Sequence, residues 1–379
     1  MKSVVWGAMG TNLISLRFRK AIAKPAAPAG GRKFRYIRLC IRPYYVREAL
    51  LCVLLPDTVS YWERKRLGFM TISGIIEKLQ EALGEDLVLR DAPMREHTTF
   101  RVGGPADALV LPRTREDAQQ ALSLCAGLGV PLMVLGNGSN LLVRDGGIRG
   151  VVLQFGDQFA RIEVDGAAVR AQAGALLVAV AAAAARANLT GMEWASGIPG
   201  SIGGAAAMNA GAYGGEMKDI IESVTVVTPD GQLQTFTNGQ MAFGYRHSAA
   251  SDGALTVVDV ALRLQPGDPE RIRAQTAEYT TARRTKQPLE FPSAGSFFKR
   301  PAGHFAAKLI EDAGLKGLRV GGAMVSEKHA GFIVNVGGAS AGDVLSLAAQ
   351  VVARVREHAG VDLEMEVKVV GEDAPRQTI

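Results

Sequence analysis

The sequence predicts a mixed α/β protein with two or three domains. Its 379 residues, 47% of them hydrophobic, are enough to form two or three separate cores. From residue 98 onward, strand-like apolar runs alternate with helix-like segments, which indicates α/β architecture. The 44 glycines gather in short runs, and such runs mark places where the backbone turns tightly or approaches a ligand.

Residues 1–69 differ in charge from the rest of the chain. They contain 14 Lys and Arg against 3 Asp and Glu, whereas residues 70–379 contain 29 basic and 34 acidic residues. The main body therefore gives no general reason to expect nucleic-acid binding. The basic segment is Arg-rich and acid-poor, as transit peptides are. Two alternatives are a basic surface-binding arm, and a non-native extension upstream of a natural start at Met70.

Membrane, metal and disulfide signals are weak in this sequence. Arginines interrupt the best apolar run of the first 69 residues, so no bilayer-spanning segment is predicted. The three cysteines, Cys40, Cys52 and Cys125, have no CxxC spacing, and the five histidines are scattered. We therefore predict no metal site and no disulfide framework, and a reducing cytoplasm as the compartment.

The elements after Met70 can be predicted in order. Apolar residues at helical spacing predict a helix within residues 70–94. The apolar run at 106–112 predicts a short strand, and residues 114–129 predict a helix that begins at a threonine. Two further strands are expected at 131–136 and 150–155.

The loop GNGSN, residues 136–140, follows a predicted buried strand. Glycine lets backbone N–H groups turn toward an anion, and the Ser and Asn side chains add donors, so the loop could cradle a diphosphate. An ordinary turn is the alternative. Leu141 stands where GxGxxG would need its third glycine, which disfavours a Rossmann fold.

A second glycine-rich stretch, residues 191–216, has eight glycines interspersed with apolar side chains. Packed, irregular, glycine-rich backbone is costly in conformational entropy. A ligand that touches the main chain over a long path, such as a dinucleotide, would explain that cost. The Ala-rich segment before it, residues 173–189, is predicted to be a packing helix.

Eight motifs along the chain resemble those of the UDP-N-acetylenolpyruvoylglucosamine reductase (MurB) family. Each motif is weak alone, but eight in order over about residues 75–371 are specific. Only 50 residues separate Arg246 from Ser296, which resembles the shorter, type II class without a substrate-covering tyrosine loop. The motifs are TTFRVGGPAD, LGNGSNLLVRD, GIPGSIGGAAAMNAGAYGGE, FGYRHS, RRTKQP, AGSFFKRP, AGLKGLRVGGAMVSEKHAGFIVN and LEMEV.

The resemblance implies an α+β fold. A two-subdomain FAD-binding fold of the vanillyl-alcohol-oxidase (PCMH) type would be joined to an α+β substrate-binding domain. Residues 70–155 would form the first FAD-binding subdomain and 156–265 the second. Residues 266–361 would bind substrate, and residues 362–379 would return to the second subdomain.

The resemblance also implies an activity. NADPH would reduce bound FAD, and flavin N5 would pass hydride to the β-carbon of UDP-N-acetylglucosamine enolpyruvate. Protonation of the α-carbon would then give UDP-N-acetylmuramate, a peptidoglycan precursor. The expected protein is a cytoplasmic flavoenzyme, a monomer or weak dimer, without nucleic-acid or integral membrane partners.

Three residues are the implied catalytic groups. Arg246 would bind the substrate carboxylate with its forked guanidinium, and a protonated Glu366 would hydrogen bond to the enolate. Ser296 would donate the proton, although a hydroxyl is so weak an acid that it needs a cation nearby; Lys286 is the preferred candidate. Taken without the resemblance, these residues would be a surface arginine, one side of a strand over 363–371, and a turn serine. His247 has only its adjacency in its favour.

The remaining implied contacts fall into two sets. The substrate-binding set is Tyr245, Lys286, Lys299 and Arg300. The FAD-binding set is Gly136, Asn137, Gly138, Ser139, Asn140, Ile198, Pro199, Gly200, Ser201, Gly203, Gly204, Asn209, Gly211, Ala212 and Tyr213.

Two other functions compete with the reductase. A flavin-dependent oxidase of the same fold would be expected to tether FAD through a His or Cys in the glycine-rich loops, and neither loop contains one. A non-catalytic flavin-binding module would be expected to have lost catalytic positions, yet Arg246, Ser296 and Glu366 are all present.

Overall fold

Helix α2 (Ile72–Leu83) begins the part of the chain that the computed structural model describes, residues 71–374. The predictions for residues 1–69 lie outside this range. Thr71 caps the helix by accepting from the Gly74 N–H. The helix predicted within residues 70–94 is confirmed, and it ends at Leu83. Gly84 follows with a φ of 102°, which does not continue an α-helix.

The first sheet has four strands in the order β1-β2-β5-β3. β1 is antiparallel to β2, whereas β2 and β3 are both parallel to β5. Helix α3 (Arg115–Leu128) begins at a capping box between Thr114 and Asp117, which confirms the helix predicted to begin at a threonine. The three strands predicted around it correspond to β2, β3 and β5. The strands are β1 (Val88–Pro93), β2 (Pro105–Val110), β5 (Ile148–Gln154) and β3 (Leu132–Leu135).

The second sheet is antiparallel, with the order β12-β11-β13-β7-β6. Helices α4 (Leu177–Arg186) and α5 (Ile202–Ala207) contact it, and α4 is the predicted Ala-rich helix. One hydrophobic cluster includes buried residues of both sheets and of the second glycine-rich segment, whereas Leu135 and Leu141, on either side of the 136–140 loop, belong to another cluster. The strands are β12 (Leu233–Thr237), β11 (Ile221–Val227), β13 (Thr256–Arg263), β7 (Ala168–Gln172) and β6 (Ile162–Asp165).

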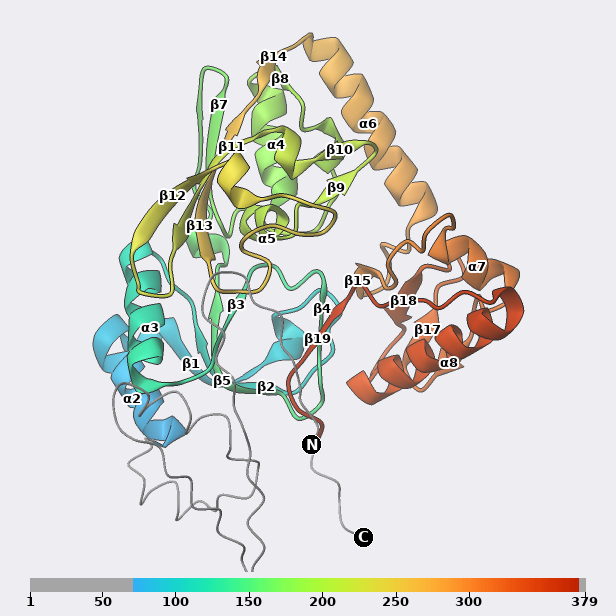
Figure 1. The fold of residues 1–379 in the computed structure, drawn as a ribbon, viewed down its shortest axis with the longest axis horizontal. Helices are drawn as coiled ribbons and strands as arrows, with labels where there is room; N and C mark the ends of the chain where they lie inside the picture. Colours follow the sequence, from blue (N-terminus) through green and yellow to red (C-terminus); the bar gives the residue numbers. More distant parts are fainter. Residues whose placement is uncertain (1–70, 375–379) are drawn as a thin grey trace, which may run out of the picture. The chain divides into compact units, whose positions relative to one another are not determined.

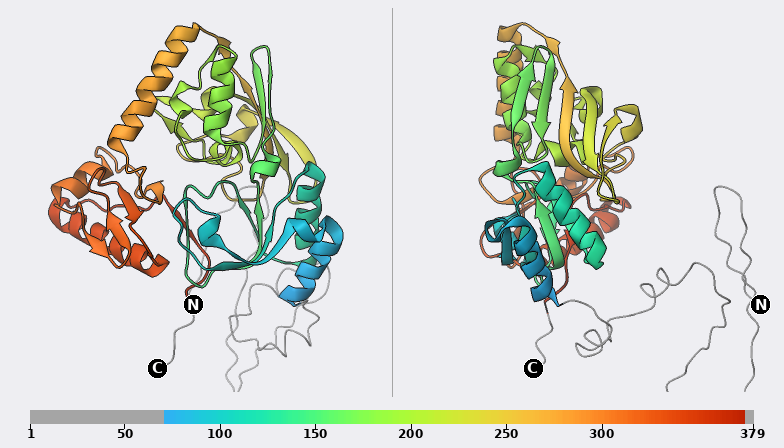
Figure 2. Two further views of the ribbon diagram at one scale, coloured as in Figure 1. Left: turned by 180° about the vertical axis from the view of Figure 1, so that it is seen from behind. Right: turned by 90° about the vertical axis from the view of Figure 1, so that its left-hand side faces the viewer.

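Helix α6 (Pro269–Lys286) leads from the second sheet to a third, smaller sheet (Figures 1 and 2). Asp268 caps α6 at its first turn. The third sheet has the order β15-β18-β17-β16 and a separate hydrophobic cluster, to which α7 (Ala306–Asp312) and α8 (Ala341–Ala359) contribute. Its strands are β15 (Ser293–Ser296), β18 (Phe332–Asn335), β17 (Ala323–Val325) and β16 (Arg319–Val320).

Three two-stranded ribbons complete the described strands, and short 3₁₀ turns lie between elements. β19 (Lys368–Val370) pairs in parallel with β4 (Leu141–Val143). The resemblance implied that this terminal segment returns to the subdomain formed by residues 156–265, whereas its strand partner lies within residues 70–155. The other ribbons are β9 (Gly211–Ala212) with β10 (Gly215–Glu216), and β8 (Leu189–Thr190) with β14 (Gln265–Pro266).

The segment before β19 differs from the strand predicted over 363–371. Only residues 368–370 form a strand, because residues 363–367 follow a separate path beside the third sheet, with a single bridge from Met365 to Phe298. Leu363 and Val367 are buried, but Met365 is 39% exposed. Strict alternation of buried and exposed side chains therefore fails at Met365.

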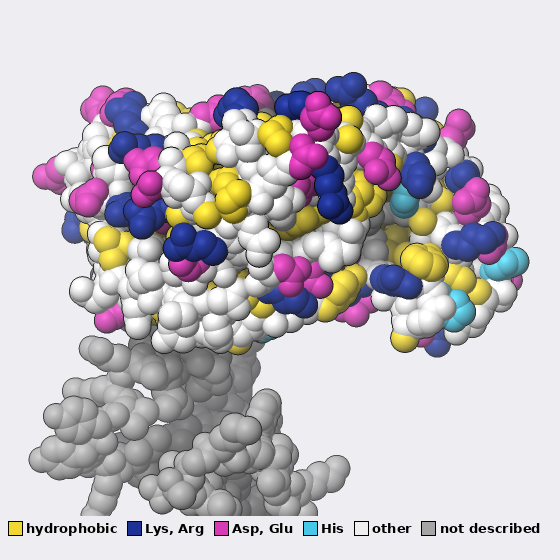
Figure 3. Space-filling model, turned by 90° about the horizontal axis from the view of Figure 1, so that it is seen from above, with side chains coloured by type: hydrophobic (Ala, Val, Ile, Leu, Met, Phe, Trp, Pro, Cys, Tyr) yellow, Lys and Arg dark blue, Asp and Glu magenta, His cyan; other side chains and the backbone are white. Residues whose placement is uncertain are grey.

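Acidic and basic side chains are interspersed on the face shown in Figure 3, rather than gathered by sign. Among the helices of residues 71–374, none is long and apolar enough to cross a membrane. No cluster of three or more His, Cys, Asp or Glu within these residues could hold a metal ion.

Candidate functional site

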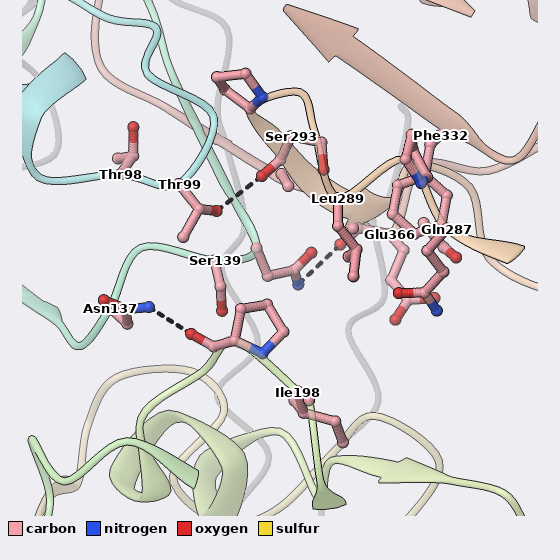
Figure 4. A pocket seen from close by; sticks show the side chains of 18 of the residues that line it. Thr98, Thr99, Asn137, Ser139, Ile198, Gln287, Leu289, Ser293, Phe332 and Glu366 are labelled. Carbon is pink, nitrogen blue, oxygen red and sulfur yellow. Dashed lines mark hydrogen bonds between the residues drawn. The ribbon is translucent and has the colours of Figure 1, made fainter. Parts of the chain in front are cut away.

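Two adjoining cavities lie among the glycine-rich loops and the third sheet. The first, of about 770 Å³, is lined by residues 96–99 and 101, by residues 137, 139 and 140, by the 197–199 segment and by residues 287–296 (Figure 4). The second, of about 460 Å³, runs between the 132–141 segment and α5. Asn137, Ser139, Asn140, Ile198, Met208 and Ala210 line both cavities.

The 136–140 loop is held by its own side chains. Asn137 Nδ2 donates to the Pro199 carbonyl, and Asn140 Nδ2 donates to the Glu366 carbonyl at 3.3 Å (Figure 4). Gly138 has a φ of 60° and leaves no room for a Cβ against the Thr98 backbone. The two asparagines thus position the loop, while Ser139 faces both cavities.

Two hydroxyls at the cavity walls have no hydrogen-bond partner within residues 71–374. Ser201 is 2% exposed and stands at the N-cap of α5, but its Oγ does not cap the helix; the residue lines the second cavity. A Cβ on Gly136 would collide with this hydroxyl. Thr98 Oγ1, on a residue 6% exposed, belongs to the first cavity. Because buried hydroxyls normally have partners, these two fit a ligand that supplies hydrogen-bonding groups.

Arg246 lies in a two-residue turn between Gly244 and His247. The Gly244 N–H donates to the His247 carbonyl at 2.9 Å, and Arg246 has a φ of 53°, which is costly for a residue with a Cβ. Its Nε donates to Glu366 Oε1 at 2.8 Å, with the two side chains 28% and 14% exposed. Residues 120 positions apart thereby form a half-buried ion pair on the cavity wall.

Ser296 ends β15 and is exposed in the first cavity. Phe297 and Phe298, the next two residues, are 0% and 4% exposed, so they anchor the strand in the hydrophobic cluster of the third sheet. The Glu366 N–H donates to the Phe297 carbonyl at 2.9 Å. The structure therefore brings the three predicted catalytic side chains, Arg246, Ser296 and Glu366, to one cavity.

The predicted cofactor residues divide between the cavities. Besides the shared positions, Pro199, Gly211 and Ala212 line the first cavity, and Gly136, Gly138, Gly200, Ser201, Gly203 and Gly204 line the second. Asn209 lines neither: it is 1% exposed and its amide contacts protein groups. Tyr213 also lies off both linings, and its ring stacks on Tyr279 with centroids 4.3 Å apart.

Four predicted substrate contacts are not among the residues that line either cavity. Lys299 Nζ pairs with Glu364, and the Arg300 guanidinium lies 4.0 Å from the Phe305 ring centroid. Tyr245 is 63% exposed. Lys286 ends α6, one residue before Gln287, which does line the first cavity.

Arg283 lines the first cavity but is not among the predicted site residues. It is 9% exposed, its Nε has no partner among residues 71–374, and burial lowers the pKa of its guanidinium. Gly197 and the Tyr213 ring border it. The motif RRTKQP contains Arg283, but it also contains Arg284 and Lys286, and nothing in the local sequence shows which of the three side chains is buried at the cavity wall.

A hydrogen-bonded pair behind the 136–140 loop was also missed. His97 Nδ1 and Gln154 Oε1 are 2.8 Å apart, and Gln154 Nε2 donates to the Gly136 carbonyl at 3.1 Å. Both side chains line the first cavity. No local pattern connects these residues, because they come from different elements.

Comparisons with known proteins cover most of the described residues. A family profile described as "UDP-N-acetylenolpyruvoylglucosamine reductase, C-terminal domain" matches residues 287–370, and one described as "FAD binding domain" matches residues 106–237. The chain is 50% identical over 298 residues to the UDP-N-acetylenolpyruvoylglucosamine reductase of Clostridium botulinum strain Hall, covering 79% of this chain and 97% of the relative. It is 49% identical over 304 residues to that of Clostridioides difficile strain 630, covering 80% and 100%.

A solved structure is similar in both sequence and fold. The UDP-N-acetylenolpyruvylglucosamine reductase (MurB) from Thermus caldophilus is 40% identical, with a TM-score of 0.64, over 74% of this chain and 97% of that one. Together with the two profiles, this match confirms the predicted fold class: an FAD-binding domain of the PCMH type joined to a C-terminal α+β domain.

Proposed function

Because the chain belongs to the UDP-N-acetylenolpyruvoylglucosamine reductase family, we propose that it reduces UDP-N-acetylglucosamine enolpyruvate to UDP-N-acetylmuramate in peptidoglycan precursor synthesis. It is then a UDP-N-acetylmuramate dehydrogenase, a flavin-dependent oxidoreductase that uses NADPH. The observation that carries the proposal is the Arg246–Glu366 ion pair, which faces the same cavity as Ser296.

The glycine-rich cavities fit FAD. Glycine at 136 and 138 lets the loop pack against Ser201 and the Thr98 backbone, where a Cβ would collide, and the unpartnered Ser201 hydroxyl offers a donor. Residues 136–140 and 198–204 would hold the cofactor along these walls. Bound FAD would take hydride from NADPH and supply it to the enolpyruvyl β-carbon.

Arg246 would bind the substrate carboxylate. Its guanidinium has further N–H groups beyond the Nε that Glu366 occupies, and a fork of donors suits a carboxylate. Negative charge grows on the α-carbon and carboxylate during hydride transfer, so a preorganised donor there stabilises the transition state, typically by about 3 to 4 kcal/mol.

Glu366 would complete the enolate site. Its Oε1 accepts from Arg246, and its backbone is fixed by Phe297 and Asn140. The contact with Arg246 fits an ionised carboxylate, so Glu366 would have to take up a proton when the substrate carboxylate engages Arg246, and would then hydrogen bond to the enolate oxygen. Its 14% exposed side chain limits competition from water.

Ser296 would protonate the α-carbon. General acid help of this kind contributes about 10²- to 10⁴-fold. The assisting cation was expected to be Lys286, but the cations on the wall of this cavity are Arg101, Arg246 and Arg283. Arg246 is the best supported of them, since it is tied to Glu366, whose N–H binds the residue after Ser296.

Several finer points belong to the same proposal. The 50-residue spacing between Arg246 and Ser296 supports membership of the type II class. The cysteine spacing supports a cytoplasmic location. A monomer or weak dimer remains our prediction, to be measured by sedimentation.

The test is NADPH consumption by the purified, FAD-loaded protein with and without UDP-N-acetylglucosamine enolpyruvate. We expect rapid oxidation only with the substrate; oxidation that ignores the substrate would exclude this function. A Ser296→Ala variant should still be reduced by NADPH but stall when substrate is added. Normal turnover by that variant would remove Ser296 from the donor role.

A further inference from the structure

Asn209 is a buried amide with all of its hydrogen bonds inside the protein. It is 1% exposed and has a φ of 44°. Its Nδ2 donates to Glu216 Oε2 at 2.7 Å and to the Gly244 carbonyl at 2.9 Å, while its Oδ1 accepts from the Lys218 N–H at 2.9 Å. The side chain thus joins the hairpin of β9 and β10 to the turn that contains Arg246.

The same turn is held from its other side. Ser248 Oγ and Ser251 Oγ both donate to the Ala207 carbonyl, at 2.6 and 2.8 Å. Residues 207 and 209 therefore hydrogen bond to the chain on both sides of Arg246: to Gly244 before it, and to Ser248 and Ser251 after it. Met208, between the two anchors, lines both cavities.

The Arg246 turn needs such support. A left-handed φ costs a non-glycine residue on the order of 1 to 3 kcal/mol and persists where the surroundings hold it. The Asn209 amide contacts the first carbonyl of the turn, two residues before Arg246. Loss of that contact would let the turn relax and move the guanidinium away from Glu366.

We propose that Asn209 is a positioning residue for Arg246: through the Gly244 carbonyl it holds the guanidinium in the place where Glu366 and the substrate carboxylate meet it. The expected effect on reoxidation by the substrate rests on the proposed function, whereas the expected effect on the position of Arg246 does not. It gives Asn209 a different role from the cofactor contact that the resemblance implied.

The structural consequence is tested without turnover. In heteronuclear NMR spectra of the FAD-loaded protein, the Arg246 Nε–H signal is identified by its loss in Arg246→Lys. Asn209→Ala should shift or broaden that signal. Asn238→Ala is the matched control, because Asn238 Nδ2 also bridges two carbonyls, those of Lys218 and Ile221, but does not contact the turn. It should leave the Arg246 signal unchanged.

The kinetic consequence separates the two half-reactions. Asn209→Ala should be reduced by NADPH within about twofold of the unmodified protein, whereas reoxidation by the enolpyruvyl substrate should slow about 100-fold, the cost of a displacement near 1 Å. Glu216→Ala removes the other Nδ2 acceptor and should slow neither step selectively. In the Arg246→Lys background, Asn209→Ala should slow reoxidation little further, because both substitutions act through the Arg246 guanidinium.

The outcomes are decisive in either direction. An unchanged Arg246 signal in Asn209→Ala, an equal loss in both half-reactions, or a loss no larger than that of Asn238→Ala overturns the proposal. If Asn209→Ala does not fold, Asn209→Asp replaces it, since the aspartate keeps the volume and the acceptor for Lys218 but cannot donate to Gly244. If the unmodified protein does not reduce the substrate, only the proposed function is refuted. The NMR comparison still tests whether Asn209 positions Arg246.

Discussion

Replacing Ser201 by alanine should change the stability of the FAD-free protein and its affinity for FAD in opposite directions. The Ser201 hydroxyl is buried without a partner, and burial of an unsatisfied hydroxyl costs about 1 to 3 kcal/mol. Ser201→Ala should therefore raise the free energy of unfolding of the FAD-free protein by up to about that amount. Urea unfolding followed by circular dichroism measures this change.

The same substitution should weaken FAD binding. If the hydroxyl donates to a charged phosphate oxygen, its hydrogen bond is worth about 1.5 to 3 kcal/mol. That corresponds to an increase in Kd of about tenfold to 100-fold. Titration of the FAD-free protein with FAD, followed by flavin fluorescence, gives the Kd directly.

Ser326→Ala is the control for both measurements. Ser326 is also 2% exposed, but its Oγ accepts from the Lys328 and His329 N–H groups, each at 3.2 Å. Its loss should destabilise the FAD-free protein and leave the FAD Kd unchanged. If Ser201→Ala destabilises as Ser326→Ala does, or binds FAD as the unmodified protein does, then Ser201 is not a free donor for the cofactor.

Three further outcomes are expected. Phe297→Ala should lower the free energy of unfolding by about 3 to 5 kcal/mol, because the Phe297 ring is fully buried. Phe305 is 61% exposed, so Phe305→Ala should change the free energy of unfolding by less than about 0.5 kcal/mol. Equal effects of the two substitutions in urea unfolding would contradict this packing. Burial lowers the pKa of His329 below its ordinary value of 6.5, so the unfolded chain is protonated first as the pH falls. Stability should therefore decline below about pH 6.5, and His329→Gln should reduce that decline in melting temperatures recorded from pH 7.5 to 5. Burial raises the pKa of Cys125 to about 11, so alkylation at pH 8, located by mass spectrometry, should reach Cys125 only after unfolding.

Local patterns determined much of this protein from the sequence alone. Thr114 and the apolar spacing after it predict α3, and the runs around it predict β2, β3 and β5, because capping and periodicity depend on residues only a few positions apart. Eight motifs in order likewise carried the family resemblance, and it was this resemblance that implied the flavin fold and nominated Arg246, Ser296 and Glu366.

Contacts between distant residues were decided only by the tertiary structure. The Arg246–Glu366 pair joins positions 120 residues apart, and β19 pairs with β4 across more than 200 residues. Asn209 stands in a glycine-rich motif beside residues that line the cavities, yet its amide faces the Arg246 turn. Arg283 is buried at the cavity wall, whereas Lys299 pairs with Glu364 outside the cavity linings. Sequence spacing tells which side chains share a local element, but the direction in which each one points across a cavity depends on how whole elements pack.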